Sequence, residues 1–398
     1  MKDLIKKIAN TISSEIIDYR RHLHQNPELS FKEYNTSTYI SDILKSKNIE
    51  VEEIKEGIAQ TGFVAYIRGK NPDKKTVALR ADMDALPIKE QNDVPYKSEN
   101  EGIMHACGHD VHSSSLLGTA TILNELKDQF EGTVKLVFQP GEELLPGGAS
   151  LMIKAGILQN KQIKAMFGQH VATQIEVGKV GFRSGIYMAS ADEIYLTIKG
   201  KGGHAAMPDL AIDPVLITSH IIIALQQVVS RNANPKIPSV LSFGKVIAEG
   251  ATNIIPNEVH VAGTFRTLNE EWRAEAKKRI TRIATGIAES MGGTCEVNIV
   301  DGYPYLENNP LLTENAKLNA IEFLGEENVV DLDIWMASED FAYYTHHVNS
   351  CFYRLGVRNE AKGIISGVHT PTFNVDEKSL EIGSGLMAWL ALKELENV

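Results

Sequence analysis

A short segment before residue 115 carries several groups that can bind a metal ion. Residues 105–112 include one thiol, three imidazoles and one carboxylate. Cys107 and His109 stand two positions apart, and a thiolate and an imidazole on irregular backbone can face the same cation. A buried cysteine beside solvent-facing histidines would give the same short pattern, so this segment alone does not decide between the two.

Paired acids follow a second segment. Glu142 and Glu143 come directly after the apolar run 133–138 and a Pro-Gly turn. Two acids at that place suit a site in which one carboxylate binds metal and the other moves protons. A plain turn also explains the proline and glycine.

Three further segments add candidates of the same kind. His170 follows the apolar run 165–168, and His369 stands in a predicted loop near the C-terminus. Glu339 and Asp340 form another acidic pair, which a helix N-terminus after Ser338 explains equally well.

Together these segments supply more ligands than one metal ion needs. A single catalytic zinc uses three protein ligands and a water. Five ligand-type residues and a spare glutamate therefore fit two metals roughly 3.5–4 Å apart that activate one water between them. The spare acid, Glu142, is then the base that takes the proton from that water. The five ligand-type residues are Cys107, His109, Glu143, His170 and His369.

The elements that must position these residues are read from the apolar pattern. The residues from Leu4 to Leu23 recur at helical spacing and predict an opening amphipathic helix. Short apolar runs then alternate with helix-like stretches, which predicts βαβ units and a mainly parallel sheet. Ligands collect beyond the carboxyl ends of such strands. The predicted strands are 62–67, 76–79, 133–138 and 165–168, and the helices between them include 114–126 and 149–155.

The pattern changes near Tyr187. From there the predicted order is β-α-β-β-α-β, the ferredoxin-like unit. The fold class is therefore α/β: a discontinuous catalytic domain, 1–186 and 300–398, is interrupted by an inserted domain, 187–299. The predicted elements of the insert are strands 194–198, 240–247, 258–266 and 295–300 and helices 215–229 and 270–291.

Composition narrows the class of protein. The 398 residues are 43% hydrophobic and 23% charged, which is typical of a globular chain. The net charge of −11 argues against nucleic acid or anionic lipid as a partner. Three cysteines fit a reducing compartment. No signal peptide or membrane span is predicted, so we expect a cytoplasmic enzyme.

The chain resembles a known family over almost its whole length, from about His22 to Phe373. It is similar to the amidohydrolase branch of the co-catalytic metallopeptidases, which includes hippurate hydrolases, auxin-conjugate hydrolases and aminoacylases. The motifs that carry the resemblance are 79–87, 104–112, 139–143, 203–206, 253–257 and 338–341.

The resemblance implies roles for the residues of the first domain. It implies that Glu142 is the general base and later the proton donor, and that Asp84 orients a metal ligand. It implies that Cys107 bridges the two metals. The metal ligands that it implies are Cys107, His109, Glu143, His170 and His369.

One departure from the wider peptidase family is informative. The other branches have a histidine where this chain has Asp82, and they use carboxylates at the positions of Cys107 and His170. The departure favours the amidohydrolase branch over the carboxypeptidase and dipeptidase branches. A thiolate suits zinc, whereas the mixed donor set also accepts manganese, cobalt or nickel.

The inserted domain contributes residues of its own. The pattern G-x-G-x-x-A at 200–205 is not read as a dinucleotide site, because Pro208 interrupts the helix that should follow. The resemblance implies that His204 polarises the scissile carbonyl, often from the partner subunit of a dimer. It also implies that Asn253 and Arg266 bind the substrate carboxylate.

The expected reaction is hydrolysis of the amide of a small N-acyl amino acid, with the inserted domain acting as lid and as the interface of a homodimer. A dipeptidase or carboxypeptidase on the same scaffold is the first alternative. A catalytically silent binding protein is the second, but the base and all five ligand residues are present. The acyl group, the amino acid and the native metal have no recognisable code in the sequence.

Overall fold

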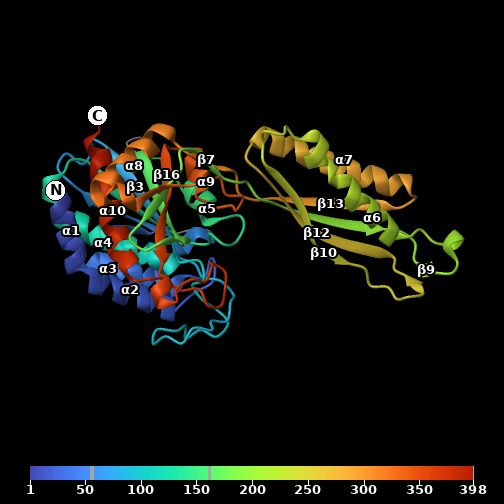
Figure 1. The fold of residues 1–398 in the computed structure, drawn as a ribbon, viewed down its shortest axis with the longest axis horizontal. Coiled ribbons are helices and arrows are strands. Elements are labelled where there is room, and N and C mark those ends of the chain that lie inside the picture. The colour runs from blue at the N-terminus through green and yellow to red at the C-terminus, as the bar shows by residue number, and fades with distance from the viewer. Residues whose placement is uncertain (54–57, 160–162, 398) are drawn as a thin grey trace. The chain divides into compact units, whose positions relative to one another are not determined.

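The computed structural model describes residues 1–53, 58–159 and 163–397, which form two units (Figure 1). Unit 1 comprises Met1–Tyr187, Glu307–Ile334 and Asp340–Val398, and unit 2 comprises Met188–Leu306 and Trp335–Glu339. The first predicted domain also contains 54–57, 160–162 and Val398, which lie outside the described residues.

Unit 1 is built on an eight-stranded sheet, which confirms the predicted α/β class with a mainly parallel sheet. Its four central strands run parallel to one another, and the next strand on each side, β2 or β6, pairs antiparallel with them. The edge strand β1 is antiparallel to β2, and β15 is parallel to β6. In order across the sheet the strands are β1 (Glu50–Glu53), β2 (Phe63–Arg68), β4 (Thr133–Gln139), β3 (Thr76–Asp82), β5 (Ile163–Glu176), β16 (Ser350–Arg358), β6 (Val180–Phe182) and β15 (Val329–Asp331).

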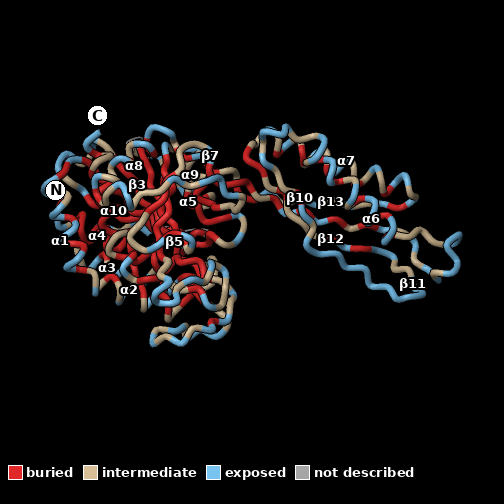
Figure 2. Tube along the Cα trace, in the orientation of Figure 1, coloured by how far each residue is buried: buried red, intermediate tan, exposed pale blue. Residues whose placement is uncertain are grey.

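Helices cover this sheet, so strands β3 and β4 are buried along their whole length. Figure 2 shows the buried interior of unit 1 in red. Helices α4 and α10 pack against each other and against β3, and α1 and α2 pack outside them. The helices of unit 1 are α1 (Lys2–Thr11), α2 (Ser13–Gln25), α3 (Tyr34–Ser46), α4 (His109–Glu125), α5 (Gly148–Lys154), α8 (Pro310–Leu324), α9 (Ala342–Thr345) and α10 (Lys378–Glu396).

Two predicted elements of unit 1 differ from the structure. The opening helix is interrupted at Ile12, which separates α1 from α2. Strand β5 extends to Glu176, so His170 lies inside a strand instead of just beyond one. The apolar run stops at Gly168, but β5 continues because β16 pairs with it through His170 and beyond. The end of an apolar run in the sequence is therefore not the end of the strand, because polar residues continue β5.

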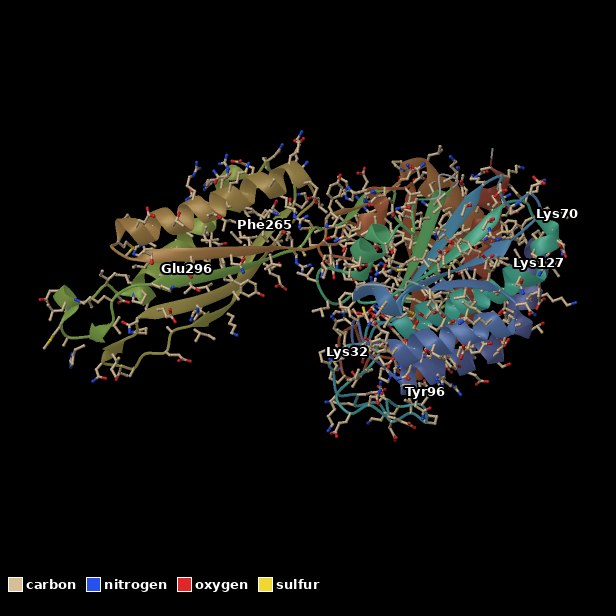
Figure 3. The ribbon with its side chains drawn as sticks, turned by 180° about the vertical axis from the view of Figure 1, so that it is seen from behind. Lys32, Lys70, Tyr96, Lys127, Phe265 and Glu296 are labelled. Atoms are coloured by element: carbon tan, nitrogen blue, oxygen red, sulfur yellow. The ribbon has the colours of Figure 1, made fainter. Side chains whose placement is uncertain are left out.

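Unit 2 has the predicted β-α-β-β-α-β order. Its antiparallel sheet has the strand order β10-β12-β8-β13, and α6 and α7 pack on it and on each other. Phe265, labelled in Figure 3, is fully buried in its core. The elements are β8 (Asp192–Lys199), α6 (Pro214–Leu225), β10 (Ser239–Ile247), β12 (Glu258–Thr267), α7 (Glu270–Ser290) and β13 (Thr294–Asp301), with the short pair β9 (Gly203–His204) and β11 (Ile254–Ile255).

Local sequence signals explain the helices of unit 2. The side chain of Asp213 accepts a hydrogen bond from the Val215 N–H, and Pro214 occupies the first turn of α6. Asn269 caps α7 in the same way. In β8 the residues Ile194, Leu196 and Ile198 alternate with outward-facing ones and face the helices.

The chain crosses between the two units at β7 (Gly185–Met188) and β14 (Leu306–Asn308). Residues 335–339 group with unit 2 because the Ala189 N–H bonds to the carbonyls of Trp335 and Ala337. Among the described residues, no helix is both long and apolar enough to cross a membrane.

Candidate metal centre and its surroundings

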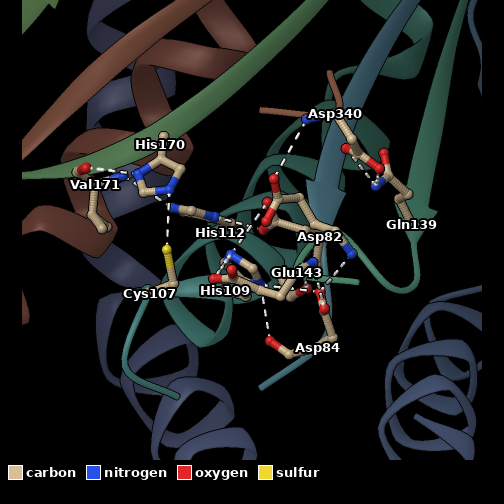
Figure 4. Close-up of polar contacts among 12 residues, drawn as sticks. Asp82, Asp84, Cys107, His109, His112, Gln139, Glu143, His170, Val171 and Asp340 are labelled. Carbon is tan, nitrogen blue, oxygen red and sulfur yellow. Dashed lines mark hydrogen bonds and ion pairs between the residues drawn. The ribbon is translucent and has the colours of Figure 1, made fainter. Parts of the chain in front are cut away.

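The candidate site of unit 1 lies where β3 and β4 end. These neighbouring parallel strands are in register from Thr76 opposite Thr133 to Asp82 opposite Gln139. The segments that follow them therefore start at the same edge of the sheet, one carrying Asp84 and the other Glu142 and Glu143. Figure 4 shows Asp84, Glu143 and the start of α4 together at this edge.

Cys107 lies between two histidines that come from distant parts of the chain. Its Sγ is 3.4 Å from Nε2 of His170, on β5, and 3.3 Å from Nε2 of His369. His369 belongs to the loop before α10 and has a left-handed φ of 60°. Its backbone N–H donates to the carbonyl of Ala106 at 2.7 Å. That bond ties the C-terminal loop to the segment that carries Cys107.

Glu143 joins the same cluster from the end of β4. Its Oε1 lies 3.0 Å from Nε2 of His369 and 4.0 Å from Nε2 of His109. All five sequence-predicted ligand residues therefore come together. Their ligand atoms form three overlapping groups within 4.8 Å: Cys107 with His109 and His170, Cys107 with Glu143 and His369, and His109 with Glu142 and Glu143.

The hydrogen bonds of two histidines show which ring nitrogen faces the cluster. His170 Nδ1 lies 2.8 Å from the Val171 carbonyl, and His109 Nδ1 lies 2.8 Å from the Asp84 carbonyl. A carbonyl can only accept, so Nδ1 carries the proton in each ring. Nε2 of His109 and of His170 is then directed at the cluster, as in a metal ligand.

The electrostatics of the cluster fit a bound cation. Burial alone would lower the pKa of His109, but Asp82, Asp84 and Glu143 raise it to about 10. Burial, followed by the charges of Glu143 and Glu142, raises the pKa of Cys107 well above its usual value. Carboxylates thus draw positive charge to this position, and a thiolate here needs a cation beside it.

Two orphaned atoms point to the same conclusion. His109 Nε2 and Glu143 Oε1 are buried and make no hydrogen bond in the described part of the chain. Glu143 Oε1 is close to His369 Nε2 but lacks the geometry of a hydrogen bond. Buried polar atoms are rarely left without a partner. Thiolate, imidazole and carboxylate donors around such atoms fit divalent metal ions of the zinc group.

Asp84 positions both His109 and the turn that carries Glu142 and Glu143. Its carboxylate accepts from Ser30 Oγ at 2.6 Å and from the Glu142 and Glu143 N–H groups at 3.1 and 3.0 Å. Its Oδ1 lies 3.2 Å from His109 Nδ1. Burial alone would raise the pKa of Asp84, but these bonds, with that of His109 the strongest, lower it. The carboxylate therefore stays ionised and contacts both His109 and the backbone of the glutamate turn.

Comparison with known proteins identifies the family. The model of peptidase family M20/M25/M40 matches residues 78–393. This chain belongs to that family.

Two relatives and one solved structure show the range of the match. Thermostable carboxypeptidase 2 of Saccharolobus solfataricus is 40% identical over 98% of this chain and 99% of its own. N-acetylcysteine deacetylase of Bacillus subtilis is 37% identical, and the match covers 97% of this chain and 98% of the deacetylase. A dinuclear metal-binding M20 peptidase structure from Bacillus subtilis is 34% identical and has a TM-score of 0.82, covering 98% of this chain and 100% of that one.

These matches make the protein a metal-dependent amidohydrolase of the M20 family. They support a centre for two divalent metal ions, and the cluster around Cys107 is its candidate location. The fold with an α/β domain and an inserted lid-type domain is that of M20 proteins.

Next to this M20 centre lies a buried charge network that the sequence did not predict. The Asp82 carboxylate accepts from Arg80 at 2.7 Å and from His112 Nδ1 at 2.6 Å. His112 Nε2 accepts from the Val171 N–H at 2.9 Å, so His112 has no lone pair left for a metal. Arg80 also bonds to Asp340 at 2.8 Å. The one sequence feature that could have indicated this network is Arg80, a charged residue inside the otherwise apolar run of β3.

Glu142 is buried beside this network. Its Oε1 accepts a long hydrogen bond, 3.4 Å, from the backbone N–H of Asp340. Asp340 in turn accepts from Gln139 Nε2, at 2.8 and 2.9 Å, and from the Ala149 N–H. The acidic pair at 339–340 is therefore more than a helix terminus: α9 has no side-chain cap, and Asp340 joins β3, β4 and α5.

The three candidate residues of unit 2 do not gather in one place. His204 is exposed on β9, which pairs with β11, and the Ala205 N–H bonds to the Asn253 carbonyl at 3.0 Å. These two residues are therefore neighbours. Arg266 is half-buried near the other end of β12, where it donates to the Met336 carbonyl at 3.1 Å. The strand from Glu258 to Arg266 spans about 26 Å.

Proposed function

We propose that this protein hydrolyses the amide bond of N-acyl amino acids, releasing a carboxylate and a free amino acid. The observation that carries the proposal is the cluster of five ligand residues with one further carboxylate, Glu142, against it. That combination is what metal-assisted hydrolysis requires: donors for two cations and a separate base. The deacetylase relative supports an acylated amino acid as the substrate class.

The proposed ligands are Cys107, His109, Glu143, His170 and His369, with Cys107 shared between the two positions. Bound divalent metals supply Lewis acidity that polarises the acyl carbonyl and lowers the pKa of an attacking water. Zinc or manganese is the proposed native metal, and cobalt or nickel suits the same donors.

Glu142 is the proposed proton carrier. Its buried carboxylate accepts the proton of the attacking water and then passes it to the leaving amine nitrogen. Asp84 supports this role because it takes the backbone N–H groups of Glu142 and Glu143 and so orients both side chains. Both oxygens of Asp84 are committed to these and neighbouring donors, which leaves Glu142 as the base.

Three residues of unit 2 are proposed to act on the substrate. His204 polarises the scissile carbonyl, and Asn253 and Arg266 bind the α-carboxylate. Arginine suits this task because its planar guanidinium can hold a carboxylate with two hydrogen bonds. Burial lowers the pKa of Arg266, and no acidic side chain is among the causes. Within the part of the chain that the structure describes, Arg266 forms no ion pair with an acidic side chain.

We propose that His204 and Asn253 reach a substrate bound by another subunit. Within one copy, about 26 Å of strand separates the Arg266 end of β12 from the end beside β11, more than one small substrate spans. In a homodimer one copy can supply Arg266 and the other copy His204 and Asn253, so both ends of β12 need not reach the same substrate. The active site would then be incomplete in a monomer.

The surface of unit 2 supports such a dimer. Helix α6 exposes Leu216 by 51% and Ile223 by 73%, although it lies in a sheet-and-helix unit with its own core. Strand β10 is an edge strand and exposes Val246 and Ile247. Exposed apolar side chains beside a free strand edge are typical of protein interfaces.

The remaining assignments follow from this function. The proposed catalytic domain is 1–186 and 300–398, most of which lies in unit 1, and the proposed lid and dimerisation domain is 187–299, which lies almost wholly in unit 2. The proposed compartment is the cytoplasm, where reducing conditions keep the Cys107 thiol available as a ligand. The carboxypeptidase relative makes hydrolysis of a peptide C-terminus the second candidate. That reaction would use the same Arg266 and Glu142.

Amine release from a panel of N-acyl amino acids tests the proposal. The protein is stripped with a chelator and assayed with and without zinc or manganese, with dipeptides and N-blocked peptides in the same panel. We expect metal-dependent release from N-acyl amino acids in preference to peptides. Preference for peptides would favour the carboxypeptidase, and no release with any metal or substrate would favour a silent binding protein.

A further inference from the structure

The turn that carries the two glutamates is held by two buried carboxylates, of which the mechanism uses only Asp84. The three consecutive N–H groups of Gly141, Glu142 and Glu143 all point at acids. Asp84 takes the second and third. Glu33 Oε1 takes the first, at 2.8 Å. The direction of the turn therefore depends on both carboxylates.

Glu33 is itself held firmly. It is fully buried, and its Oε1 also accepts from the Phe31 N–H at 2.9 Å. Its Oε2 accepts from Thr61 Oγ at 2.7 Å. Three donors from three segments determine where the carboxylate lies, so it can act as a rigid support for Gly141.

Close packing strengthens this support. Gly141 has a left-handed φ of 56°, and a Cβ at that position would lie 2.3 Å from the ring of Phe31. The same segment reaches Asp84, because Ser30 Oγ donates to it at 2.6 Å. The segment from Ser30 to Glu33 thus contacts the glutamate turn through packing and through both acids.

Glu33 does not serve the helix that follows it. Helix α3 starts at Tyr34, yet its N-terminus has no side-chain cap from Glu33. Glu28 performs that task, since its carboxylate accepts from the Asn35 and Thr36 N–H groups at 3.2 and 2.8 Å. The hydrogen bonds of Glu33 go instead to loops around the site.

Its position is also unfavourable for an acid. Burial, followed by the charge of Asp84, raises the pKa of Glu33 to about 7. A side chain that only filled space would be more stable there as an apolar residue. We therefore attribute the presence of an acid at position 33 to the hydrogen bonds that its carboxylate oxygens accept.

We propose that Glu33 is a positioning residue for catalysis, which sets the direction of Glu142 and Glu143 by holding the Gly141 N–H. This inference rests on the proposed function, because it assigns these two glutamates to proton transfer and metal binding. The role needs an acceptor oxygen and not a charge, so glutamine is expected to replace Glu33.

The test compares Glu33→Ala, Glu33→Gln and the matched control Glu28→Ala. Glu28→Ala removes a carboxylate from the same segment without touching the turn. Cobalt affinity and visible spectrum are measured by titration, together with Tm, and kcat and KM at saturating metal. We expect Glu33→Ala to weaken cobalt binding and to lower kcat by about 10- to 100-fold, with little change in KM.

Glu33→Gln should restore both values to near those of the unchanged protein, and Glu28→Ala should lower Tm alone. Unchanged cobalt affinity and kcat in a folded Glu33→Ala would overturn the proposal, as would equal losses in Glu28→Ala or no rescue by glutamine. If the unchanged protein has no activity on any acyl amino acid, the proposed function fails, but the cobalt titration still decides the role of Glu33.

Discussion

Units 1 and 2 both contain a buried ion-pair network, and the difference between them shows which one belongs to an active site. In unit 2, Arg273 holds both oxygens of Asp192 at 2.7 and 2.8 Å and also donates to the Gly302 carbonyl. This bidentate pair joins α7 to the start of β8. Such a closed pair positions elements of a fold.

The network of unit 1, by contrast, includes buried polar atoms without a hydrogen-bond partner among the described residues. Asp82 accepts from His112 and Asp84 lies within hydrogen-bond distance of His109 Nδ1, but among the described residues the buried His109 Nε2 has no hydrogen-bond partner. A buried polar atom without a partner costs stability, and carboxylates around it favour a positive charge at that place. Buried charge is therefore not by itself a sign of catalysis. In unit 1 the unpartnered His109 Nε2 is informative because it lies among thiol, imidazole and carboxylate groups that can bind a metal ion.

The candidate residues of the two units also differ in how exposed they are and in how firmly hydrogen bonds hold them. In unit 1, Cys107, His109 and His170 are buried, Glu143 is partly buried and His369 is exposed. Hydrogen bonds to backbone carbonyls orient His109 and His170. In unit 2, His204 and Asn253 are exposed and close to each other. Residues that arrange a metal centre must be fixed by the chain itself, while residues that contact substrate must stay accessible until it binds.

The largest expected effect comes from Glu142→Gln. It should lower kcat by about 10²- to 10⁴-fold, because glutamine cannot accept the proton of the attacking water. Metal content, measured by mass spectrometry, should stay that of the unchanged protein. Glu143→Gln is the matched comparison and should lose metal. Metal loss in the first variant and retention in the second would mean that the two glutamates have exchanged roles.

His204→Ala tests whether an exposed residue of unit 2 takes part in the chemistry. We expect kcat to fall by about 10²- to 10³-fold with unchanged metal content and Tm, because one donor to the developing oxyanion is lost. His260→Ala removes another exposed imidazole of unit 2 and should leave kcat unchanged. If the two variants behave alike, the proposed role of His204 is wrong.

The smallest effect is expected from Arg266→Ala. A charge-assisted hydrogen bond contributes about 1.5–3 kcal/mol, so KM for substrates with a free α-carboxylate should rise roughly 10- to 100-fold. Substrates with an amidated carboxyl group should be almost unaffected. Arg282→Ala, on the exposed face of α7, is the control. An equal rise in KM for amidated substrates would remove Arg266 from carboxylate recognition.

Much of the fold followed from local patterns. The β-α-β-β-α-β order of unit 2 was predicted from alternating or apolar strand-like runs and from an apolar and a charged helix-like stretch. The structure adds that Asp213 and Asn269 cap the two helices. Strand β5 was cut short because Gln169 and His170 look like the end of an apolar run. They are strand residues since β16 supplies backbone partners from nearly two hundred positions away.

The sequence by itself identified the family and the candidate ligand residues, because these are carried by short stretches such as 105–112 and 139–143. It also determined the two-part architecture. Tertiary structure alone decided the geometry: that the five candidate ligand residues lie together, that His112 is already paired, and that Glu33 supports the glutamate turn. The physical reason is that hydrophobic periodicity is a local property. The partner of a buried charge, such as Asp340 for Arg80, is chosen across the whole folded chain.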